Sequence, residues 1–343
     1  MIQATWELIV AIIGIALLFD FTNGFHDSAN SISTVVSTKV LSPRNAVVFA
    51  AFFNFIAAFG FGVAVASTVS KFIHLDVVMT AVVPFIILSA LIGAITWNLI
   101  TWFFGLPTSS SHALIGGLAG AGISAAGIGA IKLDTIVLVV TFMFVSPVIG
   151  FVCGFLFMTA VLWLTRKANK QSAELYFRRL QLCSAAAYSF SHGTNDAQKT
   201  MGIILPLLFA IGYAGVGNDP NHLIVPLWVI LLSYSAIALG TLSGGWRIVR
   251  TMGYKITKLR PVHGFAAETA GAATILGASV AGIPVSTTHI ICTSIMGVGS
   301  TMGTSTVKWG VARNIMWAWI LTIPISAVIG YAAFAVIRVI IGY

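Results

Sequence analysis

The chain has 343 residues, of which 58% are hydrophobic and 8% are charged. A soluble globular domain carries about a quarter charged residues, so this chain lacks the polar side chains needed to cover a soluble surface. Apolar runs of about 20 residues recur from end to end, which indicates membrane helices rather than the short alternating strands of a membrane barrel. We therefore expect an all-α multi-pass membrane protein with roughly 10–12 transmembrane segments, and a single membrane anchor is excluded.

The formal net charge is +9, from 18 Lys and Arg against 9 Asp and Glu. Short basic loops between apolar segments mark the cytoplasmic side, so this surplus predicts an orientation and not nucleic-acid binding. We expect a cell-membrane protein with its N-terminus outside, with loops 166–179 and 247–260 in the cytoplasm. Contact of these loops with anionic lipids is compatible with this placement. The two loops hold ten of the 18 bases: Arg166, Lys167, Lys170, Arg178, Arg179, Arg247, Arg250, Lys255, Lys258 and Arg260.

The apolar segments follow one another along the whole chain. The connector 166–180 is polar, basic and free of Gly and Pro, so we expect it to separate a first half, residues 1–165, from a second half, residues 181–343. Helices are expected over approximately 6–19, 25–38, 45–70, 78–104, 108–130, 134–165, 181–212, 222–246, 262–281, 284–303 and 306–341, the last long enough for two spans around Pro324.

Two unusual motifs each occur twice, in the same order. FTNGFHD at 21–27 matches FSHGTND at 190–196 at a spacing of 169 residues, and GLPTSSSH at 105–112 matches GIPVSTTH at 282–289 at a spacing of 177. A duplication of this kind is typical of secondary transporters, which place their site near the membrane midplane where the two halves meet. We expect two inverted repeats, each with a broken or re-entrant helical hairpin.

GLPTSSSH and GIPVSTTH each stop one apolar segment and start another. Proline is favoured in the first turn of a helix and serine or threonine at its N-cap, so a new helix is expected to begin at each motif. A helix N-terminus presents free N–H groups, and nearby hydroxyl groups add donors, which together suit an oxyanion such as phosphate or sulfate. Alternatively, these hydroxyls bond to their own or neighbouring helices. The candidate anion-binding residues are Thr108, Ser109, Ser110, Ser111, Ser286, Thr287 and Thr288, with Gln198 beside the second aspartate motif.

Each of the other two motifs places an aspartate, Asp27 or Asp196, inside an apolar segment. A carboxylate at membrane depth is costly and marks a candidate functional site. Amide and hydroxyl oxygens surround both, which suits a hard cation such as Na⁺, whereas a proton relay needs only the acids and a histidine. For Asp196, an ion pair with Lys199 one turn along is an alternative. The candidate Na⁺ ligands are Asn23, Asp27, Asn30, Asn195, Asp196 and Glu268, the last an acid that no nearby residue in the sequence neutralises.

The four motifs resemble the duplicated signature of the PiT family of inorganic phosphate transporters, and the resemblance extends over nearly the whole chain. It implies a carrier with inverted repeats that moves inorganic phosphate in symport with a cation. Na⁺ serves in many members, while others use protons and carry phosphate as a neutral complex with a divalent metal. The signature residues of the family then correspond to Gly24–Asp27, Gly193–Asp196, Ser109–Ser111, Ser286–Thr288 and Glu268.

Three positions depart from the family pattern. His26 replaces the usual amide before the first aspartate, and Asn54 stands where the first half would carry the counterpart of the glutamate. Lys199 stands where the first copy of the motif has Asn30. These departures bear on the number and identity of the coupling cations and leave the anion site unchanged.

We expect a secondary active transporter that imports inorganic phosphate with Na⁺ as the coupling ion, by alternating access within a lipid bilayer. Proton-coupled symport of phosphate, or of a neutral metal–phosphate complex, is the alternative. An anion channel is disfavoured because the candidate site holds Asp and Glu, whereas anion pores favour rings of Arg or Lys. An enzyme is not expected, because Ser111 and His112 would point about 100° apart on a helix and no G-x-S-x-G element exists. A homo-oligomer is compatible with the sequence.

Overall fold

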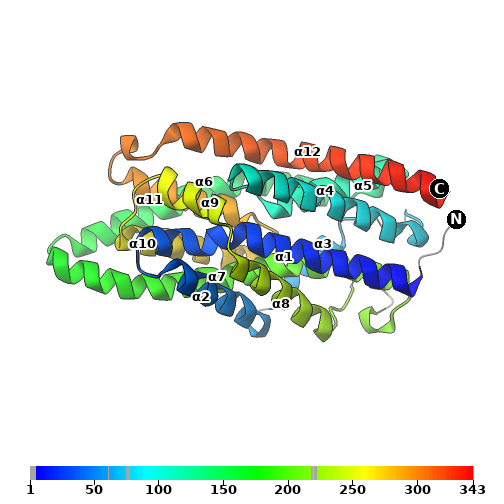
Figure 1. Cartoon of the computed structure of the whole chain (residues 1–343), viewed down its shortest axis with the longest axis horizontal. Helices are drawn as coiled ribbons and strands as arrows, with labels where there is room; N and C mark the ends of the chain where they lie inside the picture. The colour runs from blue at the N-terminus through cyan, green and yellow to red at the C-terminus, as the bar shows by residue number, and fades with distance from the viewer. Residues whose placement is uncertain (1–4, 61, 75–77, 218, 220–221, 343) are drawn as a thin grey trace.

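The computed structural model describes residues 5–60, 62–74, 78–217, 219 and 222–342. These residues form α-helices joined by short turns and loops, with no β-strand among them, which confirms the all-helical fold. The long helices run along the long axis of the molecule, and α1 begins at the same end at which α12 finishes (Figure 1). The α-helices are α1 (Trp6–Ser37), α2 (Pro43–Ile56), α3 (Ala64–Ser70), α4 (Val83–Phe104), α5 (Ser110–Ala126), α6 (Leu133–Thr165), α7 (Lys170–Ala210), α8 (Leu227–Ser243), α9 (Trp246–Arg250), α10 (Pro261–Val280), α11 (Thr287–Ser300) and α12 (Trp309–Ile341).

Four helical segments of the described chain are each long and apolar enough to cross a membrane. They are α1, α4 with the 3₁₀ turn before it, α6 and α12. Two bent pairs, α2 with α3 and α8 with α9, bring the number to six if each pair is one span. The remaining helices, α5, α7, α10 and α11, carry three of the four motifs and do not meet this criterion. The ten to twelve expected segments therefore correspond to helices, of which only some are long and apolar enough to span the membrane alone.

Several expected helix boundaries are wrong. The segment 45–70 is not continuous, because the 3₁₀ turn Ala57–Phe59 lies between α2 and α3. The segments 6–19 and 25–38 form the single helix α1, because the polar side chains between them are buried against neighbouring helices and require no break. The segment 306–341 is one helix, α12, which continues through Pro324 instead of making two spans. Proline is tolerated inside a membrane helix because neighbouring helices and hydroxyl side chains satisfy the backbone groups that it frees.

The connector 166–180 is largely helical, because α6 ends at Thr165 and α7 begins at Lys170. Asn169 caps α7 by accepting a hydrogen bond from the N–H of Gln171 at 2.9 Å. The connection between α6 and α7 lies at the end of the molecule away from the start of α1 (Figure 1).

The serine-rich motifs join α4 to α5 and α10 to α11, and we call each of these helix pairs a hairpin. The short second helix of each hairpin packs on the long last helix of the other half. Helix α5 lies against α12, and α11 lies against α6. Glycines permit this close approach: a Cβ at Gly120 would lie 1.9 Å from the carbonyl oxygen of Ala327, and a Cβ at Gly154 would lie 2.6 Å from that of Ser294. Small residues at such contacts let helix backbones approach closely in membranes. The two halves of the chain are therefore interlocked.

Candidate functional site

Both hairpins turn in the same way. Gly105 follows α4 with φ 66° and Gly282 follows α10 with φ 69°, in the left-handed region that favours glycine. Ser109 then caps α5 and Ser286 caps α11, each accepting a hydrogen bond at 3.2 Å from the N–H three residues later. The predicted helix starts at the two serine-rich motifs are confirmed, and each presents free N–H groups and hydroxyls at its N-terminus.

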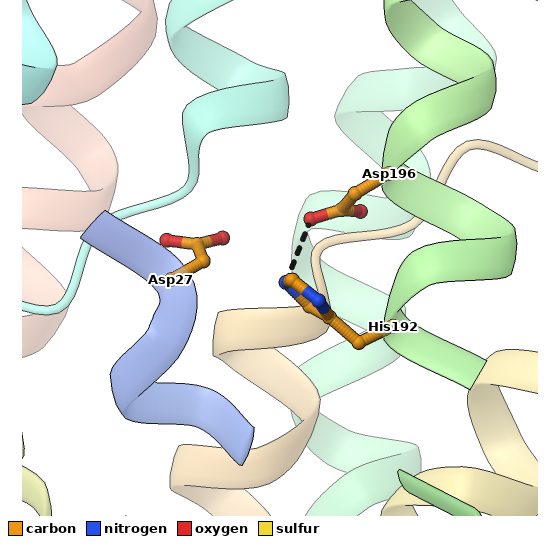
Figure 2. A group of neighbouring side chains, drawn as sticks. All are labelled: Asp27, His192 and Asp196. Carbon is orange, nitrogen blue, oxygen red and sulfur yellow. Dashed lines mark ion pairs between the residues drawn. The ribbon is translucent and has the colours of Figure 1, made fainter. Parts of the chain in front are cut away.

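The two aspartates lie close together, with a histidine between them. Asp27 projects from α1, while His192 and Asp196 project from α7 (Figure 2). The Nε2 of His192 lies 3.3 Å from Oδ2 of Asp196, and one ligand atom from each of the three residues lies within 4.8 Å of the others. All three are buried, so the carboxylates depend on these neighbours rather than on water.

Hydroxyls from both serine-rich motifs donate to these carboxylates. Ser110 Oγ lies 3.5 Å from Oδ1 of Asp27, and Thr287 Oγ1 lies 3.2 Å from Oδ2 of Asp196. Thr288 Oγ1 reaches across to Oδ2 of Asp27 at 3.3 Å. The starts of α5 and α11 thus meet α1 and α7 at one buried point, and the four motifs form a single polar cluster.

Lys199 is the cationic side chain of this cluster. Its ammonium nitrogen lies 2.5 Å from Oδ1 of Asp196 and donates to the carbonyl oxygen of Val285 at 2.9 Å and to the hydroxyl of Ser111. The ion pair with Asp196, which the sequence left open as an alternative, is therefore present. At the matching position of the first motif, Asn30 donates to Thr288 Oγ1 at 2.9 Å.

His26 and Thr108 line the side of the cluster next to α4. The Nδ1 of His26 lies 2.6 Å from Oδ1 of Asp27, and its Nε2 lies 3.1 Å from Oγ1 of Thr101. Thr108 donates to the same Thr101 hydroxyl at 2.9 Å. The histidine that departs from the family pattern therefore contacts the first aspartate directly.

Glu268 lies in a separate polar group formed by α7 and α10. Gln181 donates to its Oε1 at 3.0 Å, and Ser184 donates to its Oε2 at 2.5 Å. Asn195 is also directed toward α10, where its amide donates to Ser279 Oγ at 2.9 Å. The six candidate cation ligands are therefore distributed over more than one place.

Gln198 does not reach the aspartates. Its amide donates to the carbonyl oxygen of Gly62 at 2.8 Å, and its Oε1 accepts from the N–H of Val65 at 2.9 Å, at the start of α3. Asn23 is buried on α1, one turn before Asp27.

Sequence reasoning places His192 in the second aspartate motif without a ligand role, and it misses Thr101 as a member of the cluster. His192 lies four residues before Asp196, on the same face of α7, and this spacing was the available signal. Its Nδ1 lies 3.2 Å from Oδ1 of Asn54, which orients the ring. Thr101 carried no signal, because it belongs to an apolar segment.

The donor set matches two kinds of ligand. Carboxylate, amide and hydroxyl oxygens around Asp27 suit a hard cation, and the two capped helix starts suit an oxyanion. A helical membrane protein in which broken helices meet buried carboxylates has the construction of a secondary transporter. Residues 23–330 match the phosphate transporter family, and the chain belongs to that family.

Several known proteins are similar to the chain over nearly its full length. It is 52% identical over 324 residues to a Rhizobium meliloti (strain 1021) protein named "Probable low-affinity inorganic phosphate transporter", an alignment that covers 94% of this chain and 95% of the relative. A Bacillus subtilis (strain 168) protein of the same name is 44% identical over 97% of this chain and 98% of its own. A solved structure named "The sodium-dependent phosphate transporter" matches with a TM-score of 0.87 and 27% identity, over 97% of this chain and 100% of that chain. These relatives are named as transporters, not enzymes.

Proposed function

We propose that this protein imports inorganic phosphate across the cell membrane in symport with Na⁺, by alternating access between its two halves. One observation carries the proposal: the capped starts of α5 and α11 meet Asp27 and Asp196 at one buried point. The names of the relatives support phosphate as substrate, and the similar solved structure, which is named as sodium-dependent, supports Na⁺ as coupling ion.

The two helix starts are the proposed phosphate site, made from Thr108–Ser111 and Ser286–Thr288. Their free N–H groups and hydroxyls stabilise the negative charge of phosphate without adding fixed positive charge. The proposed Na⁺ ligands around Asp27 are its carboxylate and the amide oxygens of Asn23 and Asn30. Asp196 with Asn195, and Glu268 in its own polar group, are the further candidates.

The shared hydroxyls provide a physical link between cation and anion. Ser110, Thr287 and Thr288 donate to the carboxylate oxygens that a cation would use. Na⁺ at those oxygens replaces the hydroxyl donors, which are then free to donate to phosphate. Cation binding thereby raises the affinity for the anion, and the reverse holds by thermodynamic linkage.

Phosphate uptake into proteoliposomes tests the proposal. The purified protein is reconstituted, and uptake of labelled phosphate is followed under an imposed inward Na⁺ gradient, with choline replacing Na⁺ in the control. Uptake that requires the Na⁺ gradient is the expected result. Uptake that ignores Na⁺ but collapses with the pH gradient would instead establish proton-coupled symport of phosphate or of a metal–phosphate complex, and single-channel currents in planar bilayers would establish an anion channel.

A further inference from the structure

We infer that the ammonium group of Lys199 permanently takes the place of one coupling cation, at the second-half counterpart of the cation site beside Asp27 and Asn30. The inference rests on the proposed Na⁺ symport and adds to it a stoichiometry: the transporter carries one Na⁺ fewer per phosphate than a chain with asparagine at both matching positions.

The positions correspond in both motifs. Residues 27 and 196 are 169 apart, as are residues 30 and 199, so Lys199 is the counterpart of Asn30. In the serine-rich motifs, residues 111 and 288 are 177 apart. Asn30 donates to the Thr288 hydroxyl, and Lys199 donates to the Ser111 hydroxyl. The same crossed contact is thus made twice, once by a neutral amide and once by an ammonium group.

The oxygen atoms around the ammonium are those that a hard cation selects. Lys199 Nζ is bonded to a carboxylate oxygen of Asp196, the carbonyl oxygen of Val285 and the hydroxyl of Ser111. Carboxylate, carbonyl and hydroxyl oxygens form the usual ligand set of hard cations. The Lys199 residue is 2% exposed, so its charge is balanced by these oxygens and not by water.

The two halves therefore differ in charge at matching places. Asp196 has a fixed positive partner on its own helix, whereas Asp27 has at the matching position the uncharged Asn30, whose amide donates to Thr288. Two buried carboxylates this close repel each other, and each requires a positive partner to stay ionised. Lys199 supplies a permanent charge beside Asp196. Asp27 has His26 at 2.6 Å, a ring that carries charge only when it is protonated, and Na⁺ supplies the positive partner there from outside.

A tethered cation changes the energetics of accumulation. It does not cross the membrane, so it takes no energy from the Na⁺ gradient. At zero membrane potential, each Na⁺ that crosses multiplies the attainable phosphate ratio by the Na⁺ concentration ratio, so with a tenfold Na⁺ gradient about one tenfold factor in phosphate accumulation is given up. With Lys199 where the first half has Asn30, this pair of sites thus binds one coupling Na⁺ instead of two.

The test compares wild type with Lys199→Asn, which reproduces the first-half arrangement in the second half. Proteoliposomes are loaded with defined Na⁺ and phosphate, and the ratio of labelled Na⁺ to labelled phosphate flux is measured. We expect the ratio to rise by one in Lys199→Asn, with a steeper dependence of uptake on Na⁺ concentration. An unchanged ratio with transport retained would overturn the inference and leave the proposed symport standing.

Direct Na⁺ binding to the detergent-purified protein covers the case in which Lys199→Asn binds but does not transport. One additional Na⁺ site relative to wild type is expected, and an equal number of sites contradicts the inference. The reciprocal variant Asn30→Lys, purified in the same way, is expected to bind one Na⁺ fewer, and unchanged binding again contradicts it. Wild-type uptake that does not need Na⁺ would remove the proposed symport together with the inference.

Discussion

Glu268 shows how a single acid is held at membrane depth apart from the aspartates. Its two carboxylate oxygens accept from Gln181 and Ser184, both on α7, and the residue is fully buried. Two neutral donors leave unused lone pairs on a carboxylate, which a cation can take. This geometry favours a role of Glu268 in Na⁺ binding that is separable from phosphate binding.

We expect Glu268→Gln to raise the Na⁺ concentration for half-maximal uptake by about tenfold or more, because a charge-assisted contact is worth about 1.5–3 kcal/mol. The KM for phosphate at saturating Na⁺ should change much less. The measurement is initial uptake across a Na⁺ series. Glu174→Gln is the matched control, since Glu174 pairs with Arg260 at the surface, where an ion pair contributes little. Equal Na⁺ dependence in both variants would exclude Glu268 from the cation site.

Residue types at the cluster were predictable, and their partners were not. Asp27, Asp196 and the serine-rich motifs could be identified because polar groups repeat inside apolar segments. Nearness in sequence suggests that Gln198 joins Asp196, but residues two apart on a helix point about 200° apart, and Gln198 faces α3 instead. Which oxygens Lys199 contacts depends on how α5, α7 and α11 pack, and sequence spacing does not supply that.

At the scale of helices, the matching N-caps of α5 and α11 can be tested by measuring the stability of cap variants. We expect Ser286→Ala to destabilise the protein by about 1 kcal/mol, because the N–H of His289 loses its acceptor, whereas Ser286→Gly should cost only a few tenths. Thermal unfolding of the detergent-purified variants measures the difference. A smaller loss in Ser286→Ala than in Ser286→Gly would show that the cap does not hold the start of α11.

The contact between α1 and α8 gives a second test with an internal control. A Cβ at Gly240 would lie 2.1 Å from the carbonyl oxygen of Phe21, so Gly240→Ala must separate the helices at the first aspartate motif. Overpacking of this kind costs about 1–3 kcal/mol. Gly14 lies on α1 like Phe21, and an added Cβ there would have no atom within 4 Å. Gly14→Ala should therefore stabilise the protein by about 0.5–1 kcal/mol. Thermal unfolding reads out both, and a tolerated Gly240→Ala would contradict the close contact.

Helix starts were easier to predict than helix continuity. Gly-x-Pro followed by serine has a local cause at each position, and both starts lie where the motifs place them. The unbroken course of α1 and α12 has a tertiary cause, because neighbouring helices accept polar side chains and a proline that would interrupt an isolated helix. A single sequence does not contain that information.

For the whole molecule, the basic loops gather at one end. Arg260 pairs with Glu174 at 2.9 Å, which joins the two basic stretches, and Arg178 donates to the carbonyl oxygen of Lys39 after α1. Figure 1 places the α6–α7 connection opposite the start of α1 and the end of α12. If this end is cytoplasmic, as the positive charge indicates, the start of α1 and the end of α12 both lie outside.

Cysteine labelling tests this orientation, because α6 separates two exposed connections. Ala168 follows α6 and Gly129 precedes it, so a membrane-crossing α6 puts them on opposite sides. In a background without Cys153, Cys183 and Cys292, we expect a membrane-impermeant maleimide to label Gly129→Cys in intact cells. Ala168→Cys should be labelled only after permeabilisation. The reverse pattern would invert the orientation, and equal labelling of both in intact cells would show that α6 does not cross the membrane.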